Sequence, residues 1–79
     1  MTSGHITPQI AADVLAFRHG GRISSTFHQR LLAAIAAADA PDRNKLAAEY
    51  PAYVAAYELA AHTDSGTDFL RDRVANRSA

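Results

Sequence analysis

The positions at which helix formation must stop constrain this chain more than any other feature of its sequence. Alanine occurs 18 times among the 79 residues, and no stretch alternates apolar and polar residues as a strand would. Prolines and a glycine pair interrupt this helix-forming chain at Pro8, Gly20–Gly21, Pro41 and Pro51. Proline can start a helix but not continue one, and glycine favours a helix end. We therefore predict an all-α fold, a compact bundle of four to five short helices.

Cap residues predict the limits of these helices. Helices are expected over 8–19, from Ser24 or Ser25 to about 38, over 41–49 and over 51–62, with a fifth that begins at a Ser65–Asp68 capping box. Apolar residues at helical spacing should face the core. They are Ile10, Val14 and Phe17 in the first helix, Phe27, Leu31, Ala34, Ile35 and Ala38 in the second, and Tyr50, Tyr53, Val54, Tyr57 and Ala61 in the fourth.

The length predicts a single domain over 1–79, with residues 1–6 and 77–79 flexible. So small a core stabilises a fold only modestly, and the chain has no cysteine for a disulfide. Association between copies is the remaining common means of stabilisation. No apolar run is long enough to cross a membrane, and no signal-peptide pattern opens the chain. These features predict a cytoplasmic homo-oligomer.

Four short motifs are spread over residues 25–57. They are "STFHQRL" from Ser25, the pair Ala38–Asp39, Leu46, and "YPAYVAAY" from Tyr50. In these motifs and their spacing the chain resembles a family of small, functionally uncharacterised phage and prophage proteins. Four identities depart from the family pattern, which has Gly at Ser25, Ser at Thr26, Asn at Asp42 and Phe at Tyr50. The resemblance implies a phage or mobile-element origin, hence the host cytoplasm, and no particular activity.

Catalytic and metal-binding patterns do not stand out. The chain has no cysteine nucleophile and no serine in a glycine elbow, and its carboxylates lie at expected helix ends. The four histidines share no i, i+4 pairing, and His28 is expected to have a partly buried structural role. We expect a non-enzymatic protein without catalytic residues, cofactor or metal, which acts by binding a host or phage protein.

The start of the second helix is the main candidate for a ligand site. No acid lies over 14–38, whereas Arg22, Ser24, Ser25 and Thr26 gather there after two glycines. Free backbone N–H groups and a partial positive charge at a helix start favour anions. These residues could therefore hold a phosphorylated small molecule or nucleotide. The alternative is that Ser25 only caps the helix.

The same stretch also fits a helix-turn-helix DNA-binding regulator. The residues facing DNA would then be Ser25, Thr26, His28, Gln29 and Arg30. Eight acids balance eight bases, and this neutral charge disfavours nucleic-acid binding, which usually leaves a basic surface.

Small or apolar residues occupy the outer faces of two helices, where charged residues are usual. They are Ala33, Ala36 and Ala37 in the second helix and Leu59 in the fourth. Small side chains let another helix approach closely. We therefore predict that these four residues form an interface for self-association.

Overall fold

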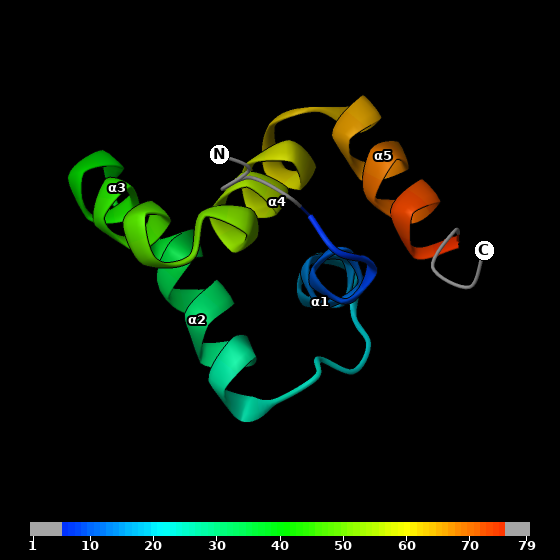
Figure 1. Cartoon of the computed structure of the whole chain (residues 1–79), viewed down its shortest axis with the longest axis horizontal. Coiled ribbons are helices and arrows are strands. Elements are labelled where there is room, and N and C mark those ends of the chain that lie inside the picture. Colours follow the sequence, from blue (N-terminus) through cyan, green and yellow to red (C-terminus); the bar gives the residue numbers. More distant parts are fainter. Residues whose placement is uncertain (1–5, 76–79) are drawn as a thin grey trace.

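A computed structural model describes residues 6–75 and arranges them in five helices joined by short turns (Figure 1). The helices are α1 (Pro8–His19), α2 (Thr26–Ala37), α3 (Ala40–Glu49), α4 (Pro51–His62) and α5 (Asp64–Ala75). The predicted all-α bundle of short helices is confirmed. No helix in this part of the chain is long and apolar enough to cross a membrane.

Local capping explains the limits of α1. Thr7 accepts a hydrogen bond from the backbone N–H of Ile10 at 3.2 Å, and Pro8 follows it in the first helical position. Gly20 ends the helix with a φ of 95°, a conformation that a side chain would disfavour. Its N–H donates to the Ala16 carbonyl at 2.8 Å. The predicted start and end of α1 are confirmed.

The next three helices begin within two residues of their predicted starts, at Thr26, Ala40 and Pro51. Ser25 Oγ accepts a hydrogen bond from the His28 N–H at 3.1 Å, and Asp39 Oδ1 accepts one from the Asp42 N–H at 3.1 Å. Pro51 occupies the first position of α4. Each signal acts within one turn, so the sequence was sufficient to predict these boundaries.

The start of α5 differs from the prediction. The helix begins at Asp64, which places Ser65 inside its first turn, where it cannot act as the cap. Thr63 provides the cap instead, because its Oγ1 accepts a hydrogen bond from the Gly66 N–H at 2.8 Å. The Ser65–Asp68 capping box was therefore wrong.

The core lies where α1, α4 and α5 pack against one another and where α2 adds Leu31, Leu32 and Ile35. Helix α3 packs against α4, and α2 packs against α1 and α4. Figure 1 shows α2 and α3 on one side of the molecule and α5 on the other, with α1 and α4 between them. The large, fully buried side chains are Val14, Leu32, Ile35 and Leu70.

The N-terminal prediction needs one correction. Ile6 was included in the flexible segment, but it is only 5% exposed and belongs to the core cluster. An isoleucine that buries its side chain against the core is held in place by the hydrophobic effect. The other predicted flexible residues, 1–5 and 77–79, lie outside the described part of the chain.

Two aromatic residues that were expected in the core are exposed. Phe27 exposes 54% of its surface and Tyr50 exposes 37%. Phe27 lies in the first turn of α2, and Tyr50 lies between α3 and α4, so neither meets the junction of α1, α4 and α5. Their rings contact each other, with centroids 5.9 Å apart. Ala34, from the same predicted stripe as Phe27, is exposed as well.

Candidate functional site

A buried carboxylate on α1 organises a polar network between three parts of the chain. Asp13 is 2% exposed, and its carboxylate accepts three hydrogen bonds. Ser24 donates its N–H to Oδ1 at 2.9 Å and its hydroxyl to Oδ2 at 2.8 Å. Tyr53 on α4 donates its hydroxyl to Oδ2 at 2.9 Å. Because a buried carboxylate needs such partners, the loop before α2 and helix α4 are both held to α1.

His28 extends this network into the first turn of α2. Its Nδ1 lies 3.1 Å from Ser24 Oγ and 2.8 Å from Ser25 Oγ. Its ring stacks on Tyr53, with centroids 5.1 Å apart and planes 14° apart. Ser24 donates its single hydroxyl proton to Asp13, so in the contact with His28 Nδ1 the Ser24 Oγ can only accept a hydrogen bond. The expected partial burial of His28 is confirmed, and these contacts occupy a residue that the DNA-binding alternative needs at the surface.

Asp13, Ser24 and His28 are the residue types of a catalytic triad, but they are connected in a different order. In a triad the carboxylate orients the histidine, and the histidine accepts the serine proton. Here the carboxylate itself accepts the hydrogen bond of the Ser24 hydroxyl, and the histidine lies beyond the serine. The histidine is therefore not placed to take the Ser24 proton as it would in a triad. The network can hold α1, α2 and α4 together.

Burial raises the pKa of the Tyr53 hydroxyl above its ordinary value of about 10, and the hydrogen bond to Asp13 and the charge of Asp13 raise the pKa further. The folded protein therefore binds this proton more tightly than the unfolded chain does. The stability that this group contributes is complete below about pH 10 and falls as the pH rises further. We expect Tyr53→Phe to lose stability less steeply than the wild type above about pH 10, in urea unfolding at each pH. Equal slopes would contradict this prediction.

The residues predicted to bind an anion lie together, but part of their hydrogen-bonding capacity is already used. Ser24 donates its hydroxyl to Asp13, and Ser25 caps α2, whereas Arg22 and Thr26 are exposed. A concavity of about 510 Å³ is lined by Pro8, Gln9, Ala12, Asp13, Arg22 and Ser24. The Asp13 carboxylate repels an anion in that concavity. Anion binding at this site stays a prediction. The acid-free sequence over 14–38 indicated a positively charged site, but Asp13 adds a negative charge to it.

Arg43 holds the corner at which α2 turns into α3. Its Nη2 donates to the carbonyl oxygens of Ile35 and Ala38, both at 3.1 Å. Its Nη1 lies 3.5 Å from Glu58 Oε2 on α4. A cation at the C-terminal end of α2 is favourable. The Ile35 carbonyl also accepts the N–H of Ala38 at 3.3 Å, so Arg43 adds a second donor there and a donor for the Ala38 carbonyl. These contacts fix the direction of α3 relative to α2.

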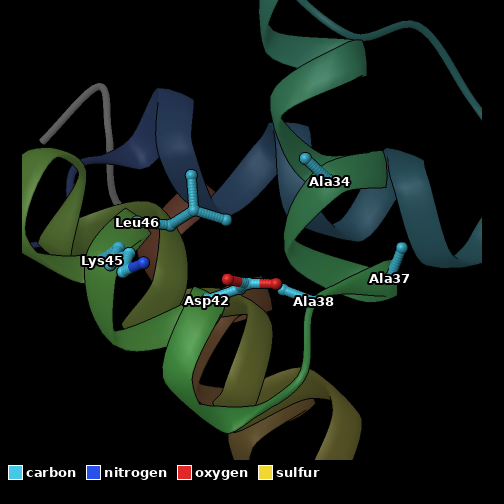
Figure 2. Close-up of a pocket in the computed structure, with 6 residues that line it drawn as sticks. All are labelled: Ala34, Ala37, Ala38, Asp42, Lys45 and Leu46. Atoms are coloured by element: carbon cyan, nitrogen blue, oxygen red, sulfur yellow. The ribbon is translucent and has the colours of Figure 1, made fainter.

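An apolar groove lies between α2 and α3 (Figure 2). Leu46 projects from α3 into the space between the two helices, and Ala38 and Asp42 lie at the corner where they join. The volume of the groove is about 490 Å³. Its lining residues, hereafter the α2–α3 groove, are Ala34, Ala37, Ala38, Asp42, Lys45 and Leu46.

The exposed aromatic pair extends this apolar surface. Phe27 precedes Ala34 by seven residues, and Tyr50 follows Leu46 by four, so each ring shares a helix face with a groove residue. The contact between the two rings joins the two faces at the end opposite the α2–α3 corner. Monomeric proteins seldom expose continuous apolar surface unless it binds something.

The four predicted interface residues do not form one surface. Ala33, Ala36 and Ala37 are exposed on α2, but only Ala37 lines the groove. Leu59 is half-buried and lines a separate concavity with residues that include Ile6 and Phe69. The outer faces of α2 and α4 differ because α4 is surrounded by α1, α3 and α5. The residues predicted to form one interface thus lie on two separate surfaces.

Sequence reasoning missed Asp13 and Arg43. The burial of Asp13 could have been predicted, because Asp13 shares a helix face with Ile10, Val14 and Phe17. A carboxylate on an apolar face must find hydrogen-bond donors when that face is buried. Arg43 gave no comparable signal, since its main partners are backbone carbonyls that reach it only after the chain has turned at the α2–α3 corner.

The described residues contain no candidate metal centre, and comparison with known proteins gives no match. Within residues 6–75, no group of three or more His, Cys, Asp or Glu side chains is placed to hold a metal ion. Comparison with known proteins found no matching family model, no matching curated protein and no matching solved structure.

Proposed function

We propose that this protein is non-enzymatic and acts by binding another protein chain in the α2–α3 groove. The observation that carries the proposal is the exposed pair Phe27 and Tyr50, whose rings contact each other between the start of α2 and the end of α3, the two helices that form the groove. Aromatic side chains are enriched among the residues that contribute most of the binding energy of a protein interface. The groove is already present in the free chain, and Arg43 bonds the carbonyls of Ile35 and Ala38 beside it, so binding needs little reorganisation.

A role as a phage-type accessory protein in the host cytoplasm is part of the same proposal. It rests on the resemblance of residues 25–57 to small phage and prophage proteins. Of the resembling positions, Phe27, Ala38, Leu46 and Tyr50 line or extend the groove. The partner is then a phage or host protein, with apolar surface that matches the groove.

The test compares two alanine-to-glutamate variants of the same helix. Ala34→Glu places a charge in the groove, whereas Ala36→Glu lies about 200° further around α2 and outside it. Glutamate is a good helix former, so both variants should keep α2 intact. Immobilised wild type and Ala36→Glu are expected to retain the same proteins, and Ala34→Glu to lose them. Each immobilised form is incubated with a host lysate to which purified wild-type chain with a different tag has been added.

The opposite results would contradict the proposal. If all three forms retain the same proteins, the α2–α3 groove is not the binding surface. If both variants lose binding equally, the effect belongs to α2 as a whole and not to the groove. Circular dichroism of each variant provides the control that the helices remain folded.

A further inference from the structure

We propose that the occupant of the α2–α3 groove is a second copy of this chain, related to the first by a two-fold axis. This inference rests on the proposed function and names its partner. A two-fold interface uses the same surface on both copies, so that surface must be complementary to itself. The groove meets this requirement in shape and in charge.

The shape of the groove is self-complementary. Its lining combines one large aliphatic side chain, Leu46, with three small ones, Ala34, Ala37 and Ala38. In a two-fold arrangement, Leu46 of each copy lies against the alanines of the other. Large side chains packed into spaces left by small ones are how facing helices achieve dense contact. Ala34 and Ala37 are exposed, so nothing in the described part of the same chain covers them.

The charges of the groove are self-complementary as well. Asp42 and Lys45 are exposed on α3 and lie three residues apart, so they share one side of the helix. When two α3 helices meet antiparallel across a two-fold axis, Asp42 of each copy faces Lys45 of the other. The dimer therefore gains two ion pairs from one pair of residues. A partner of another kind would need the reverse charge order at the same spacing.

Two exposed rings add apolar surface beside the helices that form the groove. Phe27 and Tyr50 are exposed, and their rings contact each other between the start of α2 and the end of α3. A chain with this small a core gains stability when such a face is covered.

The experiment exchanges the charges of Asp42 and Lys45. Sedimentation equilibrium of the wild type should give about 17 kDa, twice the 8.5 kDa mass of the chain. Lys45→Glu and Asp42→Lys should each weaken the dimer about tenfold, because each places like charges together twice. The double variant Asp42→Lys/Lys45→Glu should recover most of the affinity. An equimolar mixture of the single variants should form a heterodimer, since both pairs then have opposite charges.

Uncharged contacts are tested separately. Ala34→Glu is expected to be monomeric, and Ala36→Glu is expected to remain dimeric. A wild type that stays at 8.5 kDa up to millimolar concentration overturns the dimer. If the wild type is monomeric but captures another protein from the lysate, and Ala34→Glu loses that protein, the proposed function stands and only the dimer is overturned. A wild-type dimer whose affinity is the same in both single charge variants overturns the two-fold pairing of Asp42 with Lys45.

Discussion

Asp13→Ala is expected to lower the free energy of unfolding by about 3 kcal/mol. The substitution leaves the Tyr53 hydroxyl and the Ser24 N–H without their acceptor at a site that is 2% exposed. A hydrogen bond to a charged group contributes about 1.5–3 kcal/mol, and loss of a buried charge recovers part of its desolvation cost. At roughly 4–8 °C per kcal/mol for a domain of this size, the melting temperature should fall by about 15 °C.

Urea unfolding of the variant against an exposed control measures this effect. Asp72→Ala removes a carboxylate from the exposed surface of α5 and should change stability by less than about 0.5 kcal/mol. A double-mutant cycle of Asp13→Ala with Tyr53→Phe should show a coupling of about 1 kcal/mol or more, because the two groups share a hydrogen bond. If Asp13→Ala is as stable as Asp72→Ala, the network does not stabilise the fold.

Gly66→Ala is expected to destabilise the protein by about 2–3 kcal/mol, although alanine is the better helix former. Helix propensity alone would favour alanine by about 1 kcal/mol. A Cβ at Gly66, however, would fall 2.6 Å from the Leu59 carbonyl carbon and 2.5 Å from Thr63 Oγ1, and closer still to the Leu59 carbonyl oxygen. The Leu59 carbonyl is part of the α4 backbone, so it cannot move aside as the end of a flexible side chain would. The steric cost therefore exceeds the gain in propensity.

Ser65→Ala is the matched control, because Ser65 is the exposed neighbour of Gly66 in the first turn of α5. It should change the free energy of unfolding by less than about 0.5 kcal/mol. Thermal and urea unfolding of both variants measure the difference. A Gly66→Ala variant at least as stable as the wild type would mean that propensity prevails, and that α4 and α5 do not approach this closely.

The sequence by itself determined the fold class and most helix boundaries, because these depend on neighbours along the chain. Thr7 with Pro8, and Tyr50 with Pro51, mark the starts of α1 and α4 within one turn. The start of α5 was the exception. Thr63 caps α5 in place of Ser65. The Thr63 hydroxyl also donates to the Leu59 carbonyl of α4 at 3.1 Å, and this contact with the end of α4 holds it at the capping position.

Only the tertiary structure decided which residues of each helix face are buried. Helical periodicity shows which residues share a face, but burial requires a second helix alongside. Leu31 and Ile35 of α2 are buried in the core cluster, where α2 packs on α1 and α4, whereas Phe27 and Ala34 have no such cover. Their exposure, and with it the α2–α3 groove, depends on how α3 lies relative to α2, and Arg43 bonds the two carbonyls at the corner between these helices.

The same reason explains the buried carboxylate. Asp13 is charged, and composition alone places such a residue at the surface. Its partners, Ser24 and Tyr53, come from 11 and 40 residues along the chain. They become neighbours only when α1, α2 and α4 assemble. Local signals act within one turn and so predict helices, whereas burial and hydrogen bonding between helices depend on contacts that folding alone creates.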